Sequence, residues 1–266
     1  MKDIITMGID VGSTASKCVV LKNGTEIIGK ALIPVGAGTS GPERVVKEIE
    51  ETTGLKLEDM DYILATGYGR NTFDRAHQQM SELSCHAKGA HFLFPDVHTV
   101  IDIGGQDVKG ISIDTDGTVK NFAMNDKCAA GTGRFYEAMA NAFEMSLPEF
   151  SKLSLNAKNT IPITAQCTVF AESEVISLVG EGKPMDEIAA GIQLAVAKRC
   201  FVMAKKAGAT DSITLTGGCA KNEGLKKAIE KVLKIKVVEL STDPQLMGAL
   251  GAAEYARQKG LAKEMN

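Results

Sequence analysis

The 266-residue sequence contains no basic stripe, because its 30 lysines and arginines are spread along the chain beside 33 acidic residues. The formal net charge of −3 therefore gives no indication of binding to nucleic acid or to an anionic membrane. The sequence also has no run of about 18 apolar residues, the length that a membrane-spanning helix needs. Its first segment, MKDIITMGID, reaches an aspartate too early for a signal sequence. From these absences we expect a cytoplasmic protein whose partners are small molecules and protein surfaces.

The sequence also lacks a CxxC pair, although it has six cysteines, at positions 18, 85, 128, 167, 200 and 219. In a reducing compartment most of them should be thiols, and the usual place of a free cysteine is the packed core. We expect that place for Cys18, Cys85 and Cys200. Cys219 follows a glycine pair and is a candidate for the wall of a nucleotide pocket. Taken alone, Cys128 leaves three roles open, namely packing, a nucleophile and a metal ligand.

An internal repeat organises the chain. The segment IDVGSTASK ends in Lys17, seven residues after Asp10, and the segment IDIGGQDVK ends in Lys109, seven residues after Asp102. Each copy begins with a strand, a Gly-bearing turn and a hairpin, so we infer two similar lobes built on one plan. We expect the loops that follow the two aspartates to face each other.

Strands and helices are interleaved along the chain, with Asn-Gly and Asp-Gly hairpin turns at 23–24 and 116–117. The expected strands are 4–10, 17–22, 26–34, 63–66, 100–102, 108–113, 119–122, 213–216 and one near 237–240. The expected helices are 42–53, 133–145, 175–179, 185–207, 222–233 and 245–259. This order predicts the α/β class. We expect lobe I to cover residues 1–96, with a C-terminal helix at about 250–266 as a candidate to return to it, and lobe II to cover 97–249.

The short Gly-rich loops after Asp10 and Asp102 suit a triphosphate better than a dinucleotide. Gly12, Gly104 and Gly105 allow backbone N–H groups to point at phosphate oxygens without a Cβ in the way. The two aspartates, at the ends of strands, are placed to hold Mg²⁺, mostly through its waters. One such loop alone is a common turn, whereas a matched pair at equivalent places of a repeat favours phosphate binding.

Further side chains of these loops are candidates for the nucleotide site. Ser13 and Thr14 add hydroxyl donors next to Ala15. Lys17 supplies a point charge for a phosphate, with the alternative that it only supports the turn. Gln106 and Asp107 are candidates for orienting an attacking water, with the alternative that they only hold the loop. Neither Walker nor Rossmann spacing is present.

A third glycine pair follows the strand expected at 213–216. The segment LTGGCAKN contains Gly217, Gly218 and Lys221. It follows a strand and precedes a helix, which is the expected place of a loop that receives the adenosine end of a nucleotide. The segment PQLMGALGAA, which includes Gln245, begins a helix dense in small residues and suited to close packing. Either segment alone is a weak signal.

These residues resemble the superfamily of acetate kinases, sugar kinases, Hsp70 and actin, whose two lobes close on ATP. The strings MGIDVGSTASK, ATGYGRN, QMSELSCHA, VIDIGGQDVK, MNDKCAAGTGRF, CTVFAESEVIS and TGGCAKN together resemble more closely the activator component of 2-hydroxyacyl-CoA dehydratases. The resemblance covers nearly the whole chain. It implies a two-lobed actin-like ATPase fold with duplicated ribonuclease H-like lobes.

The resemblance also implies a role for two cysteines, since in that family the equivalents of Cys128 and Cys167 ligate a [4Fe-4S] cluster. Such a cluster needs four thiolates, and two per chain supply only half. A symmetric homodimer with one bridging cluster resolves this shortage. Each cysteine also stands before an expected helix start, where unpaired N–H groups favour an anionic group. Gly131 and Thr132 lie next to Cys128 and are candidates for a link between nucleotide and cluster.

The function that the resemblance implies is an ATP hydrolase coupled to low-potential electron transfer. It would take an electron from ferredoxin or flavodoxin and, with ATP hydrolysis, deliver it to the 2-hydroxyacyl-CoA dehydratase (component D) to start ketyl-radical dehydration in anaerobic fermentation. The alternatives are the ATPase subunit of a benzoyl-CoA reductase, a small-molecule kinase of the same superfamily, and an ATP-dependent chaperone or filament former. The acyl-CoA stays open because its pocket belongs to the partner enzyme.

Overall fold

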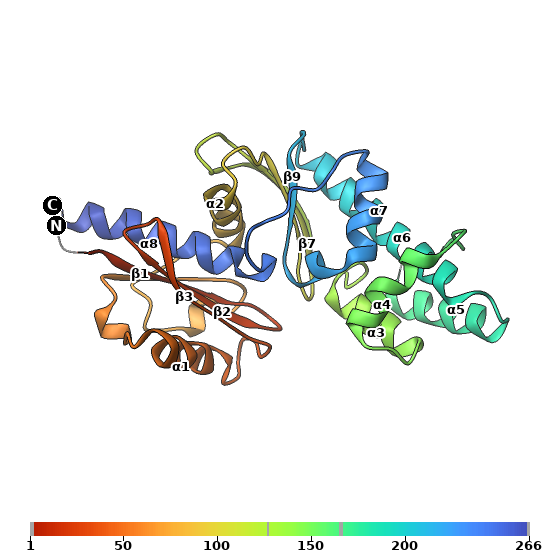
Figure 1. Cartoon of the computed structure of the whole chain (residues 1–266), viewed down its shortest axis with the longest axis horizontal. Coiled ribbons are helices and arrows are strands. Elements are labelled where there is room, and N and C mark those ends of the chain that lie inside the picture. Colours follow the sequence, from red (N-terminus) through yellow and green to blue (C-terminus); the bar gives the residue numbers. More distant parts are fainter. Residues whose placement is uncertain (1–2, 127, 165–166, 265–266) are drawn as a thin grey trace. The chain divides into compact units, whose positions relative to one another are not determined.

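The computed structural model describes residues 3–126, 128–164 and 167–264, and these form two compact units (Figure 1). Unit 1 consists of Met1–Val97, Ile113–Val119 and Leu240–Asn266, and unit 2 of His98–Ser112 and Lys120–Glu239. The C-terminal segment thus returns to the unit that contains the N-terminal strands. No helix in the described part of the chain is long and apolar enough to cross a membrane.

Unit 1 is built on a five-stranded sheet in the order β3-β2-β1-β4-β5. Its strands are β1 (Ile5–Val11), β2 (Ser16–Lys22), β3 (Glu26–Ile33), β4 (Tyr62–Thr66) and β5 (Gln78–Gln79). The central strand β1 pairs antiparallel with β2 and parallel with β4. Asn23 and Gly24 both have positive φ values, 55° and 69°, as the tight turn between β2 and β3 requires.

Helices cover both faces of this sheet (Figure 1). They are α1 (Gly41–Thr53), α2 (Glu82–Leu93) and α8 (Met247–Glu264), with short 3₁₀ helices at Leu57–Asp59, Arg70–Thr72 and Pro244–Leu246. Met7, Ile9 and Val11 of β1 pack with the apolar side of α1. The alternate residue Gly8 faces α8, because successive side chains of a strand point to opposite faces.

Unit 2 repeats the plan with a four-stranded sheet in the order β8-β7-β6-β9. Its strands are β6 (Thr99–Ile103), β7 (Val108–Ile113), β8 (Val119–Asn125) and β9 (Ile213–Thr216). The strand β6 pairs antiparallel with β7 and parallel with β9, as β1 does with β2 and β4. The internal repeat in the sequence is therefore a repeat of strand order and direction, and the expected α/β class is confirmed.

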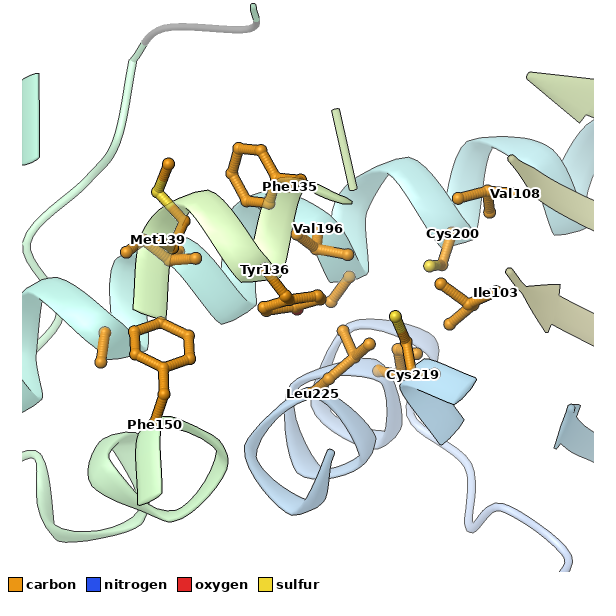
Figure 2. Packing of buried hydrophobic residues seen from close by; sticks show 14 of the residues in the cluster. Ile103, Val108, Phe135, Tyr136, Met139, Phe150, Val196, Cys200, Cys219 and Leu225 are labelled. Carbon is orange, nitrogen blue, oxygen red and sulfur yellow. The ribbon is translucent and has the colours of Figure 1, made fainter. Parts of the chain in front are cut away.

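The helices of unit 2 enclose one large apolar core (Figure 2). They are α3 (Gly133–Ala142), α4 (Leu147–Leu153), α5 (Thr168–Gly180), α6 (Met185–Lys206) and α7 (Glu223–Leu233), with 3₁₀ helices at Ser154–Asn156 and Gly218–Lys221. Phe135 and Tyr136 of α3 and Phe150 of α4 are fully buried aromatic residues at the centre of this core. Burying them stabilises unit 2 by roughly 1.5–3 kcal/mol per side chain.

Three local expectations differ from the structure. The strand expected near 237–240 is only an isolated bridge between Val238 and Thr214, so it adds no strand to the sheet. The helix expected at 175–179 is α5, which already begins at Thr168 because Cys167 takes the N-cap position. The helix α4 was not expected, although Ser146 and Glu149 form a capping box that the sequence SLPE displays.

Small residues of α8 allow α2 and β1 to approach its backbone closely. A Cβ atom at Gly251 would lie 1.8 Å from the carbonyl oxygen of Cys85, and one at Gly8 would lie 2.0 Å from that of Ala249. The close packing expected from the segment PQLMGALGAA is therefore confirmed.

The substitution Gly251→Ala is expected to lower the free energy of unfolding by roughly 2–4 kcal/mol, because α2 and α8 must separate to admit the methyl group. Gly180→Ala is the matched control, since a Cβ at this helical glycine has no atom within 4 Å. Chemical denaturation of both variants measures the effect, and equal stabilities would contradict the proposed packing.

Candidate functional site

The first Gly-rich loop of the repeat starts at the carboxyl end of β1, where Asp10 lies almost fully buried. Lys17 is its partner across the β1–β2 hairpin, and the Lys17 Nζ lies 3.0 Å from Asp10 Oδ2. Thr66 is the partner of Asp10 in the parallel strand β4. The next residue, Gly67, has a φ of +89°, and a Cβ there would lie 2.2 Å from Asp10 Oδ1. Only glycine therefore allows the chain to pass so close to this carboxylate.

Unit 2 contains the same four residue types in the same positions. Asp102 ends β6, Lys109 is its partner in β7, and Thr216 is its partner in the parallel strand β9. The Lys109 Nζ lies 3.2 Å from Asp102 Oδ2, and the Thr216 hydroxyl donates to Asp102 Oδ1 at 2.8 Å. Gly217 follows with a φ of +83°, and a Cβ there would lie 2.9 Å from Asp102 Oδ1. We call each group of Asp, Lys, Thr and Gly a quartet.

The loops themselves also match. The Gly12 N–H donates to the Ala15 carbonyl at 3.0 Å, and the Gly104 N–H donates to the Asp107 carbonyl at the same distance. Ser13 lies in the half-buried tip of the first loop. A turn of this kind is compatible with anion binding through its backbone N–H groups.

The remaining candidates in unit 1 belong to the first loop and to the segment before α8. Thr14 is half-buried at the tip beside Ser13, and Ala15 is buried. Gln245 is half-buried in the 3₁₀ helix before α8, and its N–H donates to the side chain of Asp243 at 2.9 Å.

The second loop is joined to the start of α3. The N–H groups of Gly133 and Arg134 donate to the carbonyls of Gly104 and Gly105 at 2.9 and 3.0 Å. Thr132, which is fully buried, occupies the N-cap position of α3, and its hydroxyl donates to the Ala129 carbonyl.

Other candidates in unit 2 differ in exposure. Gln106 is exposed at the tip of the second loop, whereas Asp107 is half-buried. Gly218 and Lys221 are exposed on the 3₁₀ helix after β9. Gly131 is buried with a φ of +91°.

Cys128 and Cys167 are the exposed members of the six cysteines, all of which are free thiols. Cys167 is the N-cap of α5, and Cys128 precedes α3, which packs against α5. Helix N-termini carry unpaired N–H groups and partial positive charge, which stabilise an anionic ligand.

Cationic side chains accompany Cys128. A pocket of about 540 Å³ in unit 2 is lined by Cys128 and, on α6, by Lys198 and Arg199. The guanidinium of Arg199 lies over the ring of Phe135, with 5.9 Å between its Cζ atom and the ring centroid. Positive charge at this pocket suits an anionic group beside Cys128.

The other four cysteines are buried, as expected for Cys18, Cys85 and Cys200. Cys219 also belongs to the core of unit 2, where Figure 2 shows it among apolar side chains near Cys200. Burial raises the pKa of Cys85, Cys200 and Cys219 to about 12 and raises that of Cys18 further. These thiols are inert packing groups at neutral pH.

Two of the six thiols are therefore expected to react rapidly with iodoacetamide in the metal-free protein under anaerobic conditions. At pH 8 a thiol with a pKa of 12 is ionised to only about one part in ten thousand, so the buried thiols should react slowly. Raising the pH should increase the rate at which they react with iodoacetamide. Mass spectrometry of the native protein measures the number and position of the adducts. Rapid labelling at Cys200 or Cys219 would contradict their burial in the core.

The sequence of the chain matches a known protein family. The sequence model of the BadF/BadG/BcrA/BcrD ATPase family matches residues 7–256, which is most of the chain. The chain belongs to the BadF/BadG/BcrA/BcrD ATPase family. As a member of this ATPase family it binds and hydrolyses ATP.

Relatives of known name agree with this membership. The (R)-2-hydroxyglutaryl-CoA dehydratase activating ATPase of Acidaminococcus fermentans is 52% identical over 96% of this chain and 98% of its own. The activator of lactoyl-CoA dehydratase of Anaerotignum propionicum is 50% identical over 97% and 99%. The structure of the activator of 2-hydroxyisocaproyl-CoA dehydratase from Clostridium difficile with bound ADPNP superposes with a TM-score of 0.94 at 45% identity, covering 98% and 97%.

Two more distant proteins bear on the alternatives. One of the subunits of the benzoyl-CoA reductase of Thauera aromatica is 34% identical over 97% of this chain and 96% of its own. A ROK family glucokinase from Streptomyces griseus has a TM-score of 0.52 at 15% identity, covering 96% and 99%. The glucokinase likeness concerns the fold alone and confirms the expected actin-like ATPase architecture.

Sequence reasoning missed part of each quartet in this ATPase. Thr66 and Thr216 were not named as site residues, nor were Gly67 and Lys109. The signal was present, since the segments ATGYG and LTGGC both place Thr-Gly at the end of a buried strand. Recognising it requires knowing that β4 and β9 lie parallel to the strands that carry the aspartates.

Proposed function

We propose that this protein is the ATP-dependent activator of a 2-hydroxyacyl-CoA dehydratase, acting as a homodimer with one bridging [4Fe-4S] cluster. The observation that carries the proposal is the pair of exposed thiols, Cys128 and Cys167, in a chain about 50% identical to dehydratase activators. The fold alone would suit a kinase equally well. A kinase would not need exposed thiols at the N-terminal ends of two packed helices.

We assign the binding of the nucleotide phosphates to the two Gly-rich loops that follow Asp10 and Asp102. Backbone N–H groups near Gly12 and Gly104 are proposed to bind phosphate oxygens, with the Lys17 ammonium as a further donor. Both quartet aspartates already accept contacts, Asp10 from Lys17 and Asp102 from Lys109 and Thr216. Carboxylates held in this way suit the waters of Mg²⁺ rather than direct ligation, because Mg²⁺ keeps several waters in nucleotide sites.

The thiols of one chain fit half of a [4Fe-4S] ligand set. Among the described residues no group of three or more His, Cys, Asp or Glu side chains is arranged to hold a metal ion. Two exposed thiols per chain, together with the pair of a second copy, would complete the four thiolates that such a cluster needs. When bound, the cluster would supply one-electron transfer at low potential. The cations Lys198 and Arg199 on α6 would offset part of its negative charge.

The surface of α5 suits contact with a second copy. Val169, Phe170 and Ile176 are exposed by 64%, 69% and 54%, and they lie on the helix that Cys167 caps. Large apolar side chains gathered on one exposed helix are typical of protein–protein contact surfaces. Burying this surface between two chains would also shield the sulfur ligands from water.

A backbone connection is proposed to couple nucleotide and thiols. The carbonyls of Gly104 and Gly105 accept from the first N–H groups of α3, and Cys128 lies five residues before that helix. A shift of the loop on hydrolysis would therefore move the start of α3. Through this connection ATP is proposed to gate electron delivery from ferredoxin or flavodoxin to the dehydratase.

The test is iron and sulfide content together with the mass of protein purified without oxygen. We expect about four irons per dimer. Addition of a purified dehydratase, ATP and a reduced electron carrier should then start substrate dehydration. An iron-free monomer that hydrolyses ATP, even after anaerobic reconstitution, would overturn the proposal and favour a kinase of the same fold. Activity only with a benzoyl-CoA reductase core would assign the chain to that enzyme instead.

A further inference from the structure

Lys17 and Lys109 occupy equivalent positions of the repeat but have different surroundings. The Lys17 side chain is 13% exposed, and its Nζ lies 3.0 Å from Asp10. The Lys109 side chain is 3% exposed, and its Nζ lies 3.2 Å from Asp102 and 2.7 Å from Asp107. The difference arises at one position of the loop, where the first copy has Ala15 and the second has Asp107.

The surroundings indicate different tasks. The Lys17 Nζ lies 2.9 Å from the place that a Cβ on Gly12 would take, so its charge borders the open backbone of the first loop. Lys109 is buried between two carboxylates, which compensate the cost of removing its charge from water. The Lys17 ammonium is therefore suited to contact a phosphate, whereas the Lys109 ammonium is paired with two protein carboxylates.

One oxygen of Asp107 lies close to both Lys109 and Gly104. Its Oδ1 contacts Lys109, and a Cβ on Gly104 would lie only 2.6 Å from the same oxygen. The side chain of Asp107 is still 26% exposed, in contrast to the lysine behind it. The carboxylate thus lies between a buried ammonium and the surface of the second loop.

We propose that Lys109 is a positioning residue for ATP hydrolysis, which anchors Asp107 so that this carboxylate orients the attacking water and which does not itself bind nucleotide. The inference rests on the proposed phosphate-binding role of the loop. In the reaction the water oxygen bonds to the γ-phosphorus while the bond to the ADP oxygen breaks. The proton of the water passes by way of the Asp107 carboxylate to solvent, and the products are ADP and inorganic phosphate.

A double-mutant cycle on ATP hydrolysis tests the assignment. Lys109→Met is expected to lower kcat by at least about 10-fold and Asp107→Asn by about 100-fold. The double variant should be no slower than Asp107→Asn, because the lysine acts through the aspartate. ADP affinity, measured by calorimetry, should change less than about threefold in all three, a shift well below 1.4 kcal/mol. Lys17→Met is the matched control from the repeat and should instead weaken ADP binding by about 10-fold.

Three results would overturn the proposal. Multiplicative effects of Lys109→Met and Asp107→Asn would show that Lys109 does not act through Asp107. Loss of ADP affinity in Lys109→Met would show that Lys109 contacts the nucleotide. An unchanged kcat in folded Lys109→Met would show a purely structural residue.

A second variant leaves the buried lysine intact, in case Lys109→Met does not fold. Asp107→Glu keeps the charge but displaces the carboxylate by one methylene, and it should lower kcat about as much as Asp107→Asn with ADP affinity unchanged. Full kcat in Asp107→Glu would overturn the positioning role. Failure of the dehydratase assignment is a separate outcome, since this ATP hydrolysis is measured without iron or partner enzyme.

Discussion

Replacing Cys128 or Cys167 by alanine is expected to abolish both iron binding and dehydratase activation. Each substitution removes two of the four proposed ligands, because a symmetric dimer contains every residue twice. The loss of iron affinity should be larger than the loss of about 10–100-fold that follows when a residue hydrogen-bonded to a metal ligand is replaced. ATP binding should persist, since neither cysteine belongs to a quartet. Iron content, the visible absorption of the anaerobic protein and ADP affinity measure the three consequences.

Cys200→Ala is the matched control for this experiment. Cys200 lies in the same unit as the two exposed cysteines, but it is fully buried in the core. The control should lose about 1 kcal/mol of stability through the small cavity and retain its iron. Normal iron content in Cys128→Ala or Cys167→Ala would contradict the ligand assignment, whereas loss of iron in all three variants would indicate damage to the fold.

Gly217→Ala is expected to lower ADP affinity by at least about 10-fold, or 1.4 kcal/mol, and to lower ATP hydrolysis further. The added methyl group would lie 2.4 Å from the Ile103 carbonyl oxygen and 2.9 Å from Asp102 Oδ1. It must therefore displace the end of β6 together with the aspartate of the second quartet. Calorimetric titration with ADP and steady-state hydrolysis measure these losses.

Gly182→Ala is the control that separates the effect of the steric contact at Gly217 from the effect of its left-handed backbone conformation. Gly182 has a φ of +73°, similar to that of Gly217, but a Cβ there has no atom within 4 Å. This control should cost about 1 kcal/mol of stability for the left-handed conformation and leave ADP affinity unchanged. If both variants bound ADP like the unchanged protein, the close approach of Gly217 to Asp102 would have no role in nucleotide binding.

Much of the two Gly-rich loops could be predicted because their geometry is local. The spacing from Asp10 to Lys17 and from Asp102 to Lys109 places each pair opposite across a tight hairpin, so the contact follows from a few consecutive residues. The threonines could not be found in this way. Thr216 reaches Asp102 from 114 residues away, through a parallel strand whose pairing depends on the whole of unit 2.

The cysteines show the same division. Their identity and spacing, together with the resemblance, singled out Cys128 and Cys167 as candidate ligands. The sequence left Cys219 as a candidate for the wall of a nucleotide pocket. Packing decided its position, since Leu225 and the helices α3 and α6 enclose it in the core of unit 2. Burial is a sum over contacts from distant segments, and no short stretch of sequence contains it.

The sequence by itself determined that this ATPase has two copies of one loop, because the residue types that allow close phosphate approach must be encoded in place. It also determined the small residues that let α8 lie against β1. Only the tertiary structure decided that Lys109 is buried between Asp102 and Asp107 while Lys17 stays partly exposed. The physical reason is that a backbone turn is set by neighbouring residues, whereas the surroundings of a charge are set by everything that excludes water from it.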